Sequence, residues 1–299
     1  MTKKLYIIGN GFDMHHGIAS SYKQFGEYLE KEDNETYELI DRFIGLDDEF
    51  WNELEVRLAG LDSDYLLEDM SGFLPSYGAD NWSDSGHHDF QYEVDRVVSA
   101  LSKTLLSHFS DWIRQLEIPS ATNLGASKLP LDVTSKFLSF NYTNTLQKAY
   151  GVPDSHILHI HGIAIDPNSI LTLGHGYTLP NSDPYRYETN PEDADIRVVE
   201  AISIIDDYFE NTFKNTAQII SNNLHFFLNL SNVSEVIVCG HSLEDVDAPY
   251  FEELIKSFGK NRVNWTISYY GDLESMRRKA IGLNIDPAMT KFIRLKNLV

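Results

Sequence analysis

The sequence predicts an α/β fold in which helices flank a mostly parallel sheet, with a large helical insertion after the first strand and helix. Short apolar runs rich in β-forming residues end in small polar residues, as buried parallel strands that end at a ligand crevice do. These runs alternate with stretches of helical spacing, which is the pattern of a sheet covered on both faces. The chain has 299 residues and is 42% apolar, enough to bury a sizeable core. We expect residues 1–20 and 131–299 to form the sheet domain and residues 21–130 to form the insertion, packed as a subdomain.

Taken in order, the first predicted strand covers residues 5–8, and a helix is expected from residue 14 to residue 29. Helical spacing then dominates as far as Leu116 and returns between residues 197 and 230. Polar stretches at 76–90 and 180–195 are predicted loops, and the second is a candidate lid over a site. The remaining strands are predicted at 136–140, 157–160, 171–173, 235–239, 264–269 and 290–295, and the remaining helices at 248–258 and 273–280.

Charge and cysteine content narrow the class of protein. With 24 Lys and Arg against 45 Asp and Glu, the formal net charge is −21, which disfavours nucleic acid as a main partner. Cys239 is the only cysteine, which excludes a disulfide framework and a multi-cysteine zinc site and favours a reducing, cytoplasmic setting. No apolar stretch approaches membrane-spanning length, and the first apolar run is too short for a signal peptide. We expect no resident metal and no membrane partner.

The first strand is followed by Gly9-Asn10-Gly11-Phe12-Asp13, which can form a phosphate-binding turn. Glycines let the backbone approach a pyrophosphate, and the next helix offers free N–H groups. The next glycine comes too late for the fingerprint of dehydrogenases, so a hydride-transfer cofactor is not indicated. The alternative is a tight strand-to-helix turn with Asp13 as the N-cap. In a ligand site, Asp13 suits a ribose hydroxyl better than a phosphate.

Two neighbouring strands are predicted to end in an amide and an imidazole. Asn141 can offer its amide to a ribose hydroxyl or a water, with an ordinary turn residue as the alternative. His159 and His161 are two residues apart, so on a strand they share one face. A metal is one interpretation, but only two ligands are evident locally, and a general base is preferred because imidazole titrates near neutrality. Gly162 favours His161 as that base because it lets a ligand come close. The structural alternative for either histidine is a satisfied, partly buried side chain.

Two further strand ends finish in small and polar residues. They are Gly174-His175-Gly176 and Gly240-His241-Ser242, and the second continues through Asp245 to Asp247. Each alone could be an ordinary loop, with Ser242 as a helix cap. Four such ends at one edge of a parallel sheet indicate a ligand site, because open α/β folds bind ligands there. A serine nucleophile is disfavoured, since the stretch lacks the G-x-S-x-G elbow.

Read in order, these motifs resemble the bacterial abortive-infection H (AbiH) phage-defence family over nearly the full chain. They also look, more distantly, like the sirtuin NAD-binding domain, which implies a Rossmann-like sheet of the sirtuin type. In that resemblance Asn141 stands at the catalytic asparagine and His161 at the catalytic histidine. The motifs that carry it are Ile8-Gly9-Asn10-Gly11-Phe12-Asp13, Ser139-Phe140-Asn141-Tyr142-Thr143-Asn144, His159-Ile160-His161-Gly162, Leu173-Gly174-His175 and Gly240-His241-Ser242-Leu243.

The chain departs from the sirtuin pattern at several positions. The four-cysteine zinc module is absent, so the resemblance does not extend to acyl-lysine deacylation. Thr143 stands where sirtuins carry Asp, and Asp13 stands where they carry a small hydroxyl residue near the phosphates. Ala19-Ser20 replaces the Pro-Asp of the sirtuin loop.

The resemblance implies a phage-defence effector that takes NAD as its substrate and cleaves it to nicotinamide and ADP-ribose. Asn141 would position the ribose or a water, His161 would accept a proton, and Gly9 and Gly11 would hold the pyrophosphate. Rivals are a catalytically silent sensor that binds NAD, ADP-ribose or a related nucleotide, and a nuclease-type effector. A phage-derived trigger and a second copy of the chain are further partners that the resemblance allows. The other implied dinucleotide contacts are Asn10, Phe12, Asp13, Thr143, His159, Gly162, Gly174, His175, Gly240, His241, Ser242 and Asp245.

Overall fold

The computed structural model describes residues 3–75, 88–178 and 194–298, which fall into two compact units. The sheet unit comprises Met1–Gln24, Ser110–Thr172 and Asn215–Val299, and the helical unit comprises Phe25–Phe109 and Leu173–Lys214. Each unit therefore contains segments that are distant in the sequence.

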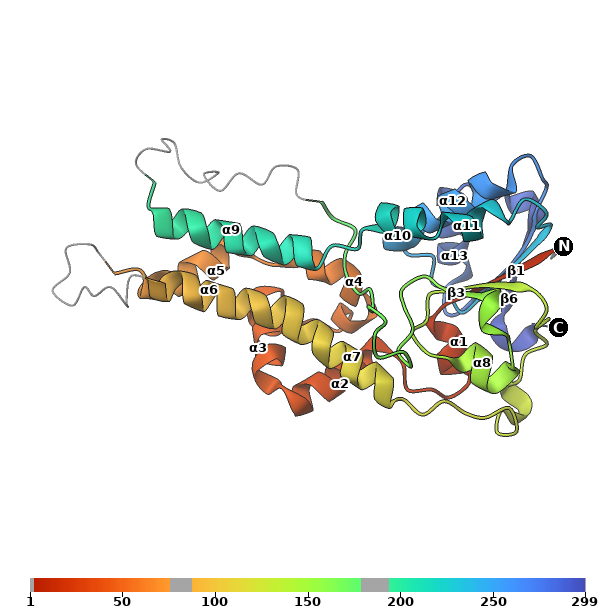
Figure 1. Ribbon diagram of the computed structural model, residues 1–299, viewed down its shortest axis with the longest axis horizontal. Helices are drawn as coiled ribbons and strands as arrows, with labels where there is room; N and C mark the ends of the chain where they lie inside the picture. The colour runs from red at the N-terminus through yellow and green to blue at the C-terminus, as the bar shows by residue number, and fades with distance from the viewer. Residues whose placement is uncertain (1–2, 76–87, 179–193, 299) are drawn as a thin grey trace. The chain divides into compact units, whose positions relative to one another are not determined.

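A parallel sheet is the centre of the sheet unit, which confirms the predicted α/β fold class (Figure 1). The six strands of the described residues lie in the order β3-β2-β1-β4-β5-β6, and every neighbouring pair is parallel. This is a Rossmann-like order, in which strands are added on one side of β1 up to β3 and on its other side from β4 onward. Folds of this order generally bind ligands outside the point between β1 and β4. The strands are β1 (Lys4–Ile8), β2 (Lys136–Ser139), β3 (Ile157–His159), β4 (Glu235–Cys239), β5 (Asn264–Tyr269) and β6 (Thr290–Arg294).

Both faces of this sheet are buried, which explains why its central strands read as continuous apolar runs rather than as alternating ones. Leu5 and Ile7 pack into one apolar cluster, while Tyr6 and Ile8, pointing the other way, pack into a second. The first face is covered by α10 (Thr216–Asn222), α11 (Leu224–Leu228), α12 (Ala248–Phe258) and α13 (Leu273–Gly282), and the second by α1 (Asn10–His15) and α8 (Thr145–Tyr150).

The helix predicted at 14–29 is two helices, and the first of them begins earlier. After β1 the chain enters α1 directly, with Gly9 at the N-cap, so the alternative that made Asp13 the N-cap is wrong. Gly17, at φ +76°, ends this stretch, because that backbone conformation does not continue a helix. The chain then resumes as α2 (Tyr22–Glu32).

One further prediction of secondary structure is wrong. Residues 171–173 form no strand, and the nearby His175 makes only an isolated bridge to Phe213 within the helical unit. The helical structure predicted between residues 197 and 230 is confirmed. It consists of three helices, which Asn215 and Asn223 separate, and Asn215 caps the second with its side chain. Most of the predicted loops at 76–90 and 180–195, including the candidate lid, lies outside the described residues.

The helical unit contains α9 (Ile196–Asn211) packed along α6 (Asp89–Ser99), as Figure 1 shows. Its apolar interior includes Phe25, whose ring meets Trp51 and Phe109 edge to face. No helix within the described ranges is long and apolar enough to cross a membrane. The other helices of the segment between β1 and β2 are α3 (Asn34–Phe43), α4 (Leu54–Arg57), α5 (Ser63–Met70) and α7 (Leu105–Gln115), whose last residues are counted with the sheet unit.

Candidate functional site

The loops after β1 and β4 meet at the point where the strand order reverses. The Gly9 N–H donates to the Cys239 carbonyl at 3.0 Å, and the Gly11 N–H donates to the Gly240 carbonyl at 2.8 Å. A Cβ on Gly240 would lie 2.1 Å from the Phe12 nitrogen, and one on Gly9 would lie 2.5 Å from a backbone carbon of the β4 loop. The glycines are therefore required by the close approach of two main chains, independently of any ligand.

This contact also uses the donors that the sequence suggested for a pyrophosphate. The N–H groups of Gly9, Gly11 and Phe12 all bond to main-chain carbonyls. The Phe12 side chain is fully buried in the core. The Asn10 amide is held by Ser20, since it donates to the Ser20 carbonyl at 2.8 Å and accepts from the Ser20 hydroxyl at 2.6 Å. The loop is thus bonded internally through both its main chain and its asparagine.

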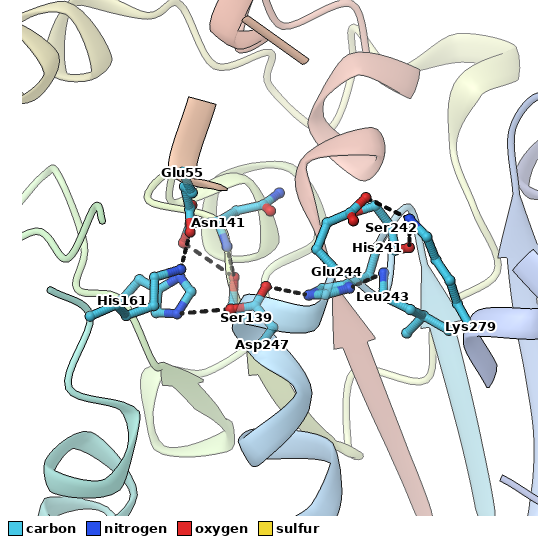
Figure 2. A network of polar contacts seen from close by, with 11 residues as sticks. Glu55, Ser139, Asn141, His161, His241, Ser242, Leu243, Glu244, Asp247 and Lys279 are labelled. Carbon is cyan, nitrogen blue, oxygen red and sulfur yellow. Dashed lines mark hydrogen bonds and ion pairs between the residues drawn. The ribbon is translucent and has the colours of Figure 1, made fainter. Parts of the chain in front are cut away.

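The register of β2 and β3 places Asn141 and His161 on neighbouring strand ends. Ser139 is paired with His159, so Asn141 and His161 each lie two residues beyond the same rung (Figure 2). The Ser139 hydroxyl accepts from the Asn141 N–H at 3.2 Å and ties that turn to the strand. The structure therefore brings the two predicted catalytic residues to the same edge of the sheet.

His161 lies beside a carboxylate that it shares with another histidine. Asp247 has one oxygen 3.7 Å from His161 Nε2 and the other 3.3 Å from His241 Nε2 (Figure 2). The Leu243 N–H donates to His241 Nδ1 at 2.9 Å, so Nδ1 is an acceptor and the neutral ring carries its proton on Nε2, toward Asp247. All three ionisable side chains are buried, and the Phe140 ring stands edge-on to both imidazoles. A carboxylate at this distance stabilises the cation that forms when the imidazole accepts a proton, which suits a general base.

Asn141 belongs to a second polar group around Asp13. The Thr143 hydroxyl donates to Asp13 Oδ2 at 2.6 Å and lies 2.9 Å from the Thr145 hydroxyl. Burial raises the pKa of Asp13 to about 6, and Thr143, Thr145 and Asn141 lower it in that order. The Asn141 amide is thus close enough to lower the pKa of the carboxyl. Among the described residues, Asp13 Oδ1 and both amide atoms of Asn141 have no hydrogen-bond partner.

Buried polar atoms without partners are rare in folded proteins and need a water, an ion or a ligand to satisfy them. Asp13 is only 1% exposed and Asn141 only 5% exposed, so bulk solvent does not supply these bonds. The group around Asp13 is therefore a place where a ligand hydroxyl or a water is expected.

His159 does not share a face with His161, contrary to the prediction. Its ring bonds to the Asn141 carbonyl at 3.1 Å and to the side chain of Gln147 on α8 at 3.0 Å, and burial lowers its pKa. Because β3 ends at His159, the strand alternation no longer applies to His161, which reaches the α12 side of the sheet. Gly162, at φ +88°, is required because a Cβ there would lie 2.4 Å from the Ile170 carbonyl oxygen.

The remaining predicted residues are not in these polar groups. Ser242 and Asp245 are exposed, and Ser242 caps no helix, because α12 begins only at Ala248. Gly174 and His175 belong to the helical unit, where His175 Nε2 lies 3.1 Å from the Thr212 hydroxyl.

Sequence reasoning placed Asp247 at the end of a polar stretch without giving it a role, and it did not single out Thr145. Asp247 lies six residues after His241, directly before α12, where its position reads as an ordinary N-cap. Its backbone does occupy that position, but its side chain makes no capping bond and turns to the histidines instead. No group of three or more metal-binding side chains is found in the part of the chain that the structure describes.

Comparison with known proteins gives one match. The model of the family described as "Bacteriophage abortive infection AbiH" matches residues 5–269, which include the whole polar edge of the sheet. No curated protein and no solved structure matches the chain.

Proposed function

The chain belongs to the bacteriophage abortive infection AbiH family, and from this premise we propose that it is an effector that hydrolyses NAD to nicotinamide and ADP-ribose. The site lies at the carboxyl edge of the sheet, beside the point where the strand order reverses. Open α/β sheets of this order bind dinucleotides at that point. In an infected cell, loss of NAD would stop growth, which suits the role for which the family is named.

The reaction needs three kinds of group, and residues at this edge can supply them. Breaking the nicotinamide–ribose bond returns its electron pair to the pyridine nitrogen and leaves positive charge on the ribose, as in other glycoside hydrolyses. Asp13, ionised above a pH of about 6, can stabilise that charge. A water then adds to the ribose carbon and loses its proton to His161, while Asn141 holds the water or a ribose hydroxyl through its amide.

One observation supports this proposal more than any other. Two residues beyond the rung that pairs Ser139 with His159 lie an amide whose two polar atoms lack a partner among the described residues and a histidine beside Asp247. Either residue alone is explained by ordinary packing. Together they provide a positioning group and a proton acceptor at one strand edge.

The test is release of nicotinamide from NAD by the purified protein, with and without extract of phage-infected cells. Asn141→Ala and His161→Gln are expected to lower the rate by about 10²–10⁴-fold, the usual contribution of positioned acid–base groups. Asn222→Ala and His225→Gln alter the same residue types at exposed positions of the sheet unit and should leave the rate unchanged. The proposal is refuted if no nicotinamide is released under any condition, or if Asn141→Ala and His161→Gln keep full activity.

A second candidate is a sensor that binds NAD or ADP-ribose without turning it over. It is favoured by the division of the polar edge into two groups, since the Asn141 side chain lies by Asp13 while the His161 side chain lies by Asp247. Nucleotide that stays bound and chemically unchanged after incubation with the infected-cell extract would select this candidate.

A further inference from the structure

The sheet unit contains a cavity whose lining includes Thr143 but none of the other predicted site residues. It has a volume of about 310 Å³, within the range of pockets that take small molecules. Its walls come from the end of α7, the loop between β2 and α8, α8 itself and the segment after β3. Thr143, which donates to Asp13, is one of its lining residues, so the cavity adjoins the polar group around Asn141.

The charge of this cavity is opposite to that of the whole chain. Arg114 and Lys148 line it, and no carboxylate is among its lining residues, whereas the chain carries a formal net charge of −21. Both cations are exposed. A local positive field in an acidic protein is the feature expected of a site for an anionic ligand.

Arg114 is held in place by the cavity wall. Its Nε donates to the Ala164 carbonyl at 3.2 Å, and the Ala164 N–H donates to the Tyr142 carbonyl at 2.7 Å. Within the described ranges this is the one hydrogen bond of the Arg114 side chain, and the Lys148 side chain makes none. The terminal guanidinium nitrogens and the ammonium group therefore remain available to acceptor atoms of a ligand, with the arginine already oriented.

We propose that Arg114 and Lys148 bind the diphosphate of the dinucleotide, an inference that rests on the proposed function. Guanidinium and ammonium groups form strong, charge-assisted bonds with phosphate oxygens. The glycine loop offers no equivalent, because the N–H groups of Gly9, Gly11 and Phe12 already bond to carbonyls. A diphosphate in the cavity leaves its ribose near the Asn141 group, since Thr143 is only two residues from Asn141, about 7 Å at full extension.

Calorimetric titration with ADP-ribose tests this assignment. Arg114→Gln and Lys148→Gln are each expected to weaken binding about tenfold, or about 1.4 kcal/mol, and the double variant about a hundredfold. Lys260→Gln and Arg262→Gln remove the same charges at exposed positions of the sheet unit outside the cavity, and they should bind as the unaltered protein does. Nicotinamide riboside, which has no diphosphate, should show no difference between the variants. Circular dichroism and thermal unfolding check that each variant is folded.

The assignment is overturned if the unaltered protein does not bind ADP-ribose, if the double variant binds it undiminished, or if the outside variants lose as much. Nicotinamide release separates this result from the proposed activity. Binding through Arg114 and Lys148 without release leaves the cavity assigned and refutes NAD hydrolysis. Release with an unchanged KM in the double variant supports hydrolysis and refutes the cavity.

Discussion

The buried carboxyl of Asp13 should make the free energy of unfolding fall as pH rises. Burial raises its pKa from 3.8 to about 6, so the folded protein holds this proton more tightly than the unfolded chain does. Well below pH 4 the Asp13 carboxyl is protonated in both the folded and the unfolded protein, so it does not reduce stability. Between pH 4 and 6 the unfolded chain loses its proton first, so stability falls as pH rises. A shift of about two pKa units corresponds to about 3 kcal/mol, all of it lost above pH 6.

Asp13→Asn removes the ionisation and keeps an acceptor for the Thr143 hydroxyl. The variant is therefore expected to gain stability relative to the unaltered protein as pH rises, by about 3 kcal/mol in total and by about 2 kcal/mol between pH 4.5 and pH 7. Urea unfolding at steps of half a pH unit measures the difference between the two proteins, which cancels the titration of the other carboxyls. Glu252→Gln, an equivalent change at an exposed position of α12, should run parallel to the unaltered protein.

The same substitution separates stability from activity. If Asp13 stabilises positive charge on the ribose, the Asn variant loses nicotinamide release although it is more stable at pH 7. In the unaltered protein, release should fall as pH drops through about 6, because the carboxyl becomes neutral. If the free energies of unfolding of Asp13→Asn and the unaltered protein change in parallel with pH, the pKa of the buried carboxyl is not raised, and the reasoning from burial is refuted.

Three further predictions test other parts of the site. Asp247→Asn should lower kcat for nicotinamide release by about 10²–10⁴-fold with KM little changed, and a change confined to KM would contradict its role in orienting His161. Gly240→Ala combines a positive φ with a Cβ 2.1 Å from a backbone atom, so it should lower the free energy of unfolding in urea by about 3 kcal/mol or more. Gly259→Ala, where φ is positive but the space is open, should lower it by only about 1–2 kcal/mol. Equal losses in the two variants would refute the packing argument. Cys239 is fully buried with its thiol pKa raised to about 12, so iodoacetamide at pH 8 should label it only after unfolding; labelling of the native protein would contradict that burial.

Local sequence was sufficient for most of the sheet. The apolar runs that end at Ile8, Ser139 and Cys239 were recognisable because strands buried on both faces contain little else. The run at 171–173 has similar composition but forms no strand, because no neighbouring strand pairs with it. Pairing is a property of the tertiary structure, so composition alone could not separate these cases.

The candidate site also has residues that the sequence predicted and residues that only the tertiary structure shows. Asn141 and His161 were candidates because each follows a strand, and the register of Ser139 with His159 places them together. Asp247 could not be selected from the sequence, because a carboxylate before a helix reads as an N-cap. Only the fold shows that its side chain turns to the two histidines.

By itself, the sequence determined the α/β class and the strand ends at which polar residues collect, because buried strands and their polar ends leave a local pattern. Only the tertiary structure decided which contacts those polar and glycine residues make. Gly9, Gly11 and Gly240 serve the contact between two loops, because backbone atoms lie where side chains would otherwise be. It also set Arg114 and Lys148 on one cavity, since α7 and α8 are separated in the sequence and only folding brings their positive charges to a common surface.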